Sequence, residues 1–202
     1  IKNVRVLDRT FNYNNKRAKE LLNLFLEFSP DICFHLEIHP ALLSEELKKE
    51  LAGLPKGLLH LEAGIQSLRE PVLEQSRRMG RLSDALDGLK YLCSLHNMET
   101  HADLIAGLPL YHLSEIFEDI HTLAEYGAGE IQLESLKLLP GTEMRRRAEE
   151  LGIQYAPLPP YEVLQTREIS VDELQTARVL SRLLDGFYNT PTWQNITRTL
   201  ML

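Results

Sequence analysis

Cysteine is the scarcest chemically useful residue in this chain. Only two occur among 202 residues, Cys33 and Cys93. Two thiols cannot build a disulfide framework, and alone they cannot complete a zinc site. Both lie in apolar surroundings, which favours buried structural thiols. Such sparse usage is typical of a reducing compartment, so we expect a cytoplasmic location.

Long hydrophobic runs and an excess of basic charge are also missing. No stretch approaches the ~20 apolar residues of a membrane helix, and no charged-then-apolar leader opens the chain. The 22 Lys and Arg residues are outnumbered by 29 Asp and Glu, which gives a net charge of −7. Because binding to nucleic-acid phosphates needs concentrated basic side chains, we do not expect a nucleic acid as partner. Because no membrane-length apolar run is present, we do not expect a membrane either.

What the chain does contain is an alternation of apolar runs and helical patterns, the signal for βαβ units and a parallel sheet. Five such units in about 150 residues fall short of the eight units of a complete barrel. The predicted fold class is therefore α/β, a partial (β/α) TIM-type barrel of about five parallel strands with outer helices. The predicted strands are Val4–Leu7, Ile32–Ile38, Leu58–Ala63, Thr100–Ile105 and Glu130–Ser135, and the clearest helices are 15–28, Leu82–Leu95, 113–125 and Glu143–Leu151.

The remaining tail changes character, because three prolines break its regularity. Val163–Ile169 is predicted as a strand. Ser170-Val171-Asp172-Glu173 has the capping-box pattern and should open a helix that runs to about Leu184. We predict a partial barrel over residues 1–155 and a C-terminal extension over residues 156–202.

Four polar residues stand at or near the ends of predicted strands, namely Asp8, Glu37, Gln66 and Asp103. Ligands of parallel α/β folds bind at the carboxyl ends of strands. Taken singly, each side chain is better explained as a helix cap or a backbone contact. Four in register favour a shared ligand site.

Four motifs in order resemble those of radical S-adenosylmethionine (radical SAM) enzymes. Leu61–Ser67 (LEAGIQS) and Ala102–Pro109 (ADLIAGLP) resemble the fourth- and fifth-strand signatures of that family. Leu139–Thr142 (LPGT) resembles the loop after its sixth strand, and Leu7–Phe11 (LDRTF) the end of its second strand. The similarity is greatest to the branch with oxygen-independent coproporphyrinogen III oxidase and the cobalamin-binding members, and it covers roughly residues 3–150.

The resemblance implies roles for five residues in binding S-adenosylmethionine (SAM). Glu37 would lie near the methionyl and ribose parts, and Gln66 would hydrogen-bond the ribose or the carboxylate. Arg78 would pair with the carboxylate, because its planar guanidinium binds such a group through two parallel hydrogen bonds. Asp103 would accept from the ribose hydroxyls, and Ile105 would pack on the adenine.

Three positions leave this assignment open. Asp8 and Thr10 stand where many family members carry a Gly-Gly-Glu motif that receives the amino group of SAM, and that motif is missing here. Arg77 is adjacent to Arg78, so either arginine could occupy the family's position.

The family's C-x-x-x-C-x-x-C motif, which holds a [4Fe–4S] cluster, is also missing. Cluster iron needs several neighbouring thiolates, and Cys33 and Cys93 are far apart in the sequence. The chain begins with Ile1 at what resembles the family's second strand. We therefore expect the cluster ligands upstream of Ile1; a degenerate homologue that has lost them is the alternative.

The predicted function is that of a fragment of a radical SAM oxidoreductase. With a [4Fe–4S] cluster supplied by upstream sequence, the resemblance implies cleavage of SAM to a 5′-deoxyadenosyl radical that acts on an unknown substrate. Cobalamin is a possible further cofactor of the intact protein, and the fragment alone should be inactive. The alternatives are a non-catalytic binding or scaffold module and a phosphate-binding barrel enzyme. A phosphate-binding barrel enzyme would need a Gly-rich loop before a helix, and this sequence contains no such loop.

Three histidines of the N-terminal part are not at metal-ligand spacing. His35, His39 and His60 are better interpreted as core or surface residues than as ligands, and no metal-ligating residue is predicted. Glu62, Glu134 and Lys137 receive no functional assignment.

Overall fold

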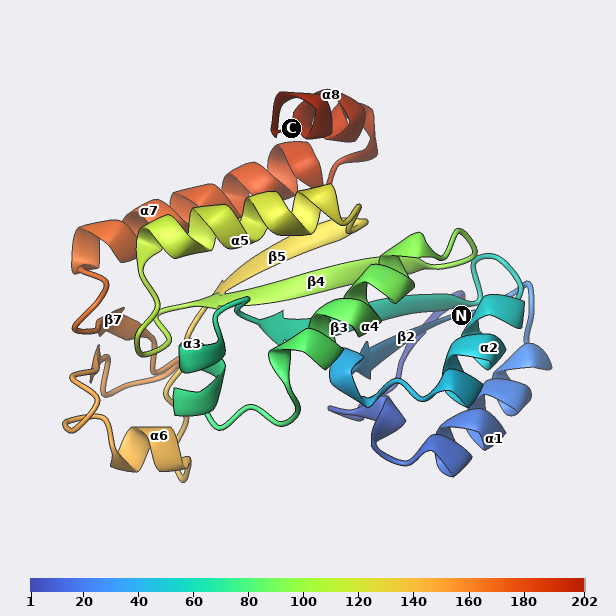
Figure 1. The fold of residues 1–202 in the computed structure, drawn as a ribbon, viewed down its shortest axis with the longest axis horizontal. Coiled ribbons are helices and arrows are strands. Elements are labelled where there is room, and N and C mark those ends of the chain that lie inside the picture. The colour runs from blue at the N-terminus through green and yellow to red at the C-terminus, as the bar shows by residue number, and fades with distance from the viewer. Residues whose placement is uncertain (202) are drawn as a thin grey trace. The chain divides into compact units, whose positions relative to one another are not determined.

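The computed structural model describes residues 1–201, with the side chains of residues 1–200 (Figure 1). By its internal contacts the chain divides into two compact units. Unit 1 comprises Ile1–Ile65, Gly80–Ala102 and Tyr126–Glu130, and unit 2 comprises Gln66–Met79, Asp103–Glu125 and the described residues from Ile131 onwards.

The main sheet contains five parallel strands in the order β1-β2-β3-β4-β5. They are β1 (Asn3–Arg5), β2 (Cys33–Ile38), β3 (Leu59–Gln66), β4 (Glu99–Ala106) and β5 (Glu130–Ser135). Every strand lies beside its neighbour in the sequence, as in a barrel rather than a doubly wound sheet. The predicted class, an α/β partial TIM-type barrel, is confirmed.

Helical elements separate the strands. The α-helices are α1 (Asn15–Leu26), α2 (Glu45–Gly53), α3 (Glu70–Gln75), α4 (Leu82–Ser94), α5 (Leu113–Glu125), α6 (Glu143–Arg146), α7 (Val171–Leu183) and α8 (Pro191–Met201). Short 3₁₀ turns η1 (Phe11–Tyr13) and η2 (Pro40–Leu42) follow β1 and β2, and a π-helical turn η3 (Leu184–Tyr188) follows α7. Within residues 1–201, no helix is long and apolar enough to cross a membrane.

In unit 1, β2 and β3 alternate strictly between two environments. Phe34, Leu36, Leu59 and Leu61 are among the residues of one face, and all are buried. The residues between them are half-buried and polar, and they include the register pairs His35–His60 and Glu37–Glu62. The helix α4 packs closely on η2. Gly88 permits this approach, because a Cβ atom built there would overlap the carbonyl oxygen of Pro40.

In unit 2, the apolar sides of α5 and α7 contact each other, and Figure 1 shows the two helices side by side. The predicted capping box opens α7. Ser170 Oγ accepts the backbone N–H of Glu173, and the Glu173 carboxylate accepts the backbone N–H of Ser170 at 2.8 Å. A small antiparallel pair, β6 (Gln154–Tyr155) and β7 (Val163–Gln165), precedes this helix.

The C-terminal part differs from the prediction in its element boundaries and in one helix. The predicted helix Glu143–Leu151 is α-helical only over Glu143–Arg146, because the following residues form tight turns that lead to Gly152 with φ +68°. The predicted strand Val163–Ile169 ends at Gln165, because the Thr166 hydroxyl accepts the N–H groups of the next residues and turns the chain. Helix α8 was not predicted.

Candidate functional site

Gln66 is the last residue of β3 and has an unusual backbone. Its φ of +74° lies in the left-handed region, which non-glycine residues rarely adopt. Its side-chain oxygen Oε1 is buried and accepts no hydrogen bond from any residue that the structure describes. A strained backbone and a buried acceptor without a donor are features that concentrate at ligand sites.

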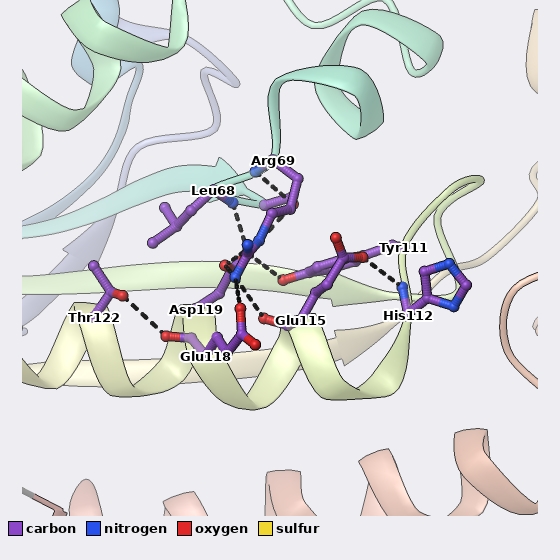
Figure 2. Close-up of polar contacts among 9 residues, drawn as sticks. Leu68, Arg69, Tyr111, His112, Glu115, Glu118, Asp119 and Thr122 are labelled. Carbon is purple, nitrogen blue, oxygen red and sulfur yellow. Dashed lines mark hydrogen bonds and ion pairs between the residues drawn. The ribbon is translucent and has the colours of Figure 1, made fainter.

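Asp119 of α5 holds the segment that follows Gln66 (Figure 2). Its carboxylate accepts hydrogen bonds from the Leu68 backbone N–H at 2.7 Å, the Tyr111 hydroxyl at 2.6 Å and Arg69 Nε at 2.8 Å. The Ser67 hydroxyl donates a longer one at 3.4 Å. Burial raises the pKa of Asp119, whereas the hydrogen bonds from Tyr111, Leu68 and Arg69 act to lower it. Burial and the Asp119 charge raise the pKa of Tyr111.

Asp119 was not among the residues predicted from the sequence, although its position in the helix pattern contained a signal. Asp119 is almost fully buried and shares the inward side of α5 with Ile116, Ile120 and Leu123. A carboxylate among apolar residues of a helix needs hydrogen-bond donors at that position. Arg69 supplies one and also reaches the exposed Glu118 at 2.7 Å.

Arg78 and Asp103 interact electrostatically within unit 2. Burial lowers the pKa of Arg78, and the negative charge of Asp103 opposes that shift. Arg77, by contrast, is exposed and pairs with Glu143 at 2.5 Å. Of the two arginines, Arg78 is therefore the half-buried one. Ile105 lies two residues beyond Asp103 on the same side of β4 and is also half-buried.

The other predicted site residues belong to unit 1. Glu37 lies 3.7 Å from Arg5, and its side chain is 41% exposed. Asp8 binds Arg17 at 2.6 Å and accepts the Thr10 backbone N–H at 3.3 Å. Arg17, followed by Thr10, lowers the pKa of Asp8. Asp8 therefore has protein partners already, and Thr10 donates its hydroxyl to the carbonyl of Arg9.

The two cysteines form no disulfide within the described part of the chain, and both are half-buried, Cys33 on β2 and Cys93 on α4. Burial raises the pKa of Cys33, which disfavours the thiolate that a metal would bind. Among the described residues, one group of His, Cys, Asp or Glu side chains has metal-binding geometry, and it contains no cysteine.

Solved structures of radical SAM enzymes share this fold. The radical SAM methyltransferase TsrM from Kitasatospora setae, with cobalamin and a [4Fe–4S] cluster bound, superposes with a TM-score of 0.62 at 20% identity over 86% of this chain and 34% of that one. Coproporphyrinogen III oxidase (HemN) from Escherichia coli, described as a radical SAM enzyme, gives 0.57 at 18% identity over 85% and 37%. The chain thus has the fold of radical SAM enzymes, as its motifs predicted.

Matches at the level of sequence cover less of the chain than the structural matches do. A family model described as "Protein of unknown function (DUF4080)" matches residues 149–202. No curated protein sequence matches the chain significantly. The chain spans about a third of the length of the TsrM and HemN chains.

Proposed function

We propose that this chain contributes the SAM-binding part of a radical SAM enzyme. The conformation and burial of Gln66 carry the proposal. This residue ends β3 with a strained backbone and a buried side-chain oxygen that lacks a donor, and Asp119 holds the segment after it. Ribose hydroxyls would supply such a donor.

The remaining predicted residues fit a nucleoside with an amino-acid side chain. Arg78 would offer its guanidinium to the carboxylate of SAM, and Asp103 would accept from the ribose hydroxyls. Ile105 would provide apolar contact for the adenine. The described residues hold an orphaned acceptor of the kind that the cofactor would fill, so they fit it.

The [4Fe–4S] cluster would supply the electron that cleaves bound SAM. The two separated thiols cannot ligate it, so we propose that a segment outside these residues provides the cysteines. In this proposal residues 1–155 form the partial barrel and 156–202 an extension, the protein is cytoplasmic, and cobalamin is a possible second cofactor.

One observation favours the alternative of a non-catalytic binding module. Asp8, at the position where the family's Gly-Gly-Glu motif would receive the amino group of SAM, is engaged by Arg17 instead. A module of this kind would still bind a nucleoside but would never cleave SAM.

Binding of S-adenosylhomocysteine, measured by isothermal titration calorimetry, tests the nucleoside site without requiring a cluster. We expect saturable binding that Gln66→Leu weakens roughly tenfold, because it removes one hydrogen-bond acceptor. Asp103→Asn should weaken binding at least as much. Gln154→Leu, at an exposed position of β6, serves as the matched control and should bind normally. Equal affinities for Gln66→Leu and Gln154→Leu would argue against the proposed site.

A further inference from the structure

Three side chains converge at the beginning of β3, β4 and β5. His60 is the second residue of β3, His101 the third of β4 and Glu130 the first of β5. The two imidazole Nε2 atoms lie 2.7 Å apart, and His101 Nε2 lies 2.6 Å from Glu130 Oε2. The three potential ligand atoms are all within 4.8 Å of one another, and the three residues belong to unit 1.

Hydrogen bonds alone do not satisfy these three side chains well. His101 Nε2 faces both His60 Nε2 and Glu130 Oε2, yet a ring nitrogen carries either one proton or one lone pair. If His101 Nε2 donates its hydrogen to Glu130, it can donate to His60 Nε2 only through the same hydrogen and at an unfavourable angle. If it carries a lone pair, that lone pair faces the carboxylate oxygen. A cation between the three atoms would accept all three lone pairs at once.

We propose that His60, His101 and Glu130 bind a divalent transition-metal ion of the zinc type. Two imidazoles and one carboxylate form a ligand set suited to zinc and leave a coordination position open for water or another ligand. Ligand atoms around tetrahedral zinc, at 2.0–2.1 Å from the metal, are separated by about 3.3 Å. Modest side-chain rotations would open the present spacing enough to admit the ion.

The surroundings of His60 suit a metal ligand. Its other ring nitrogen, Nδ1, faces the carboxylate of Glu99 at 3.4 Å, the second contact by which proteins commonly orient a ligating histidine. The ring of His35 stacks on it at 4.4 Å between centroids.

The site borders a cavity on the side of His60. This cavity of about 360 Å³ is lined by His60 together with Glu99, His96, Asn97 and Cys33. Because the three ligands start their strands whereas Gln66 ends β3, this inference does not depend on the proposed SAM site.

Zinc titration of the metal-free chain, followed by calorimetry, tests the inference. We expect saturable binding of Zn²⁺ at one site per chain. Glu130→Gln and His101→Asn should each weaken it by roughly 100-fold or more, and Glu99→Gln by roughly tenfold. His121→Asn is the control, because His121 is an exposed residue of α5 outside the cluster. No saturable binding by the unmodified chain, or equal binding by His101→Asn and His121→Asn, would overturn the inference.

Cobalt substitution gives a second readout that does not rely on affinity. Co²⁺ bound by two imidazoles and a carboxylate should show the visible d–d absorption of a four- or five-coordinate site, which Glu130→Gln should lose. Circular dichroism of each variant checks that the chain remains folded. If Glu130→Gln is folded and keeps the cobalt spectrum of the unmodified chain, Glu130 is not a ligand and the proposed site is wrong.

Discussion

Asp119 accepts the backbone N–H of Leu68 at 2.7 Å, two residues beyond Gln66. The contact joins the buried side of α5 to the turn that ends β3, and Figure 2 shows that Arg69 and Tyr111 converge on the same carboxylate. A helix residue without a predicted role thus fixes the conformation of the segment next to the candidate ligand residue. Asp119 is a positioning residue in this account.

Replacement of Asp119 by Asn should destabilise the protein by about 2 kcal/mol. The amide removes the buried negative charge that pairs with Arg69 and weakens the charge-assisted bonds inside the network. Urea denaturation measures the loss. Glu118→Gln, which removes the exposed partner of the same arginine, should cost less than about 0.5 kcal/mol. Similar losses in the two variants would contradict the role assigned to Asp119.

Two glycines of unit 1 should respond oppositely to alanine. Gly88→Ala in α4 should cost about 2 kcal/mol, because the added Cβ overlaps the Pro40 carbonyl and forces α4 away from η2. Gly53→Ala, at the end of α2, meets nothing within 4 Å and should stabilise the protein by about 0.5 kcal/mol. Thermal melts of both variants provide the comparison; a neutral Gly88→Ala would show that the α4–η2 packing is looser than described.

The capping box of α7 gives a prediction for the C-terminal part. Ser170→Ala removes the acceptor for the Glu173 backbone N–H and should lower the free energy of unfolding by about 1 kcal/mol. Ser181→Ala, inside the same helix, should have little effect because alanine favours helix. Chemical denaturation of the two variants separates the cap from a general effect of losing a hydroxyl.

Local pattern predicted the regular parts of this fold well. The strand Glu130–Ser135 and the helix at 113–125 agree with β5 and α5 at both ends, because their apolar periodicity is strong. The tail was predicted less well. There, the Thr166 side chain ends β7, and hydrogen bonds around Gly152 replace a predicted helix with turns. Contacts of this kind depend on side-chain geometry that periodicity does not encode.

The candidate site residues also divide into those that local pattern suggested and those that depend on contacts between distant segments. Strand ends suggested Gln66 and Asp103 as ligand residues, because the carboxyl ends of parallel strands share one edge. Gln66 is the last residue of β3, whereas Asp103 lies inside β4, and their ligand roles remain predictions. His60, His101 and Glu130 are far apart in sequence, and they meet only through the relative register of three strands. Register across parallel strands is set by packing and by the connecting helices, so histidine spacing alone suggested structural roles. Asp119 was missed because its partners come from another segment of the chain.

The measurement that tests the central claim most directly is 5′-deoxyadenosine formation from SAM. The longer protein in which we propose that this chain lies would be purified anaerobically, reconstituted with iron and sulfide, and supplied with a reductant. The account predicts product from that protein, a loss of roughly tenfold or more in Gln66→Leu, and none from the 202-residue chain alone. Product from the chain alone would contradict the need for outside cysteine ligands. No product from the longer protein, with cluster incorporation confirmed by absorbance, would contradict the enzymatic function and favour the non-catalytic binding module.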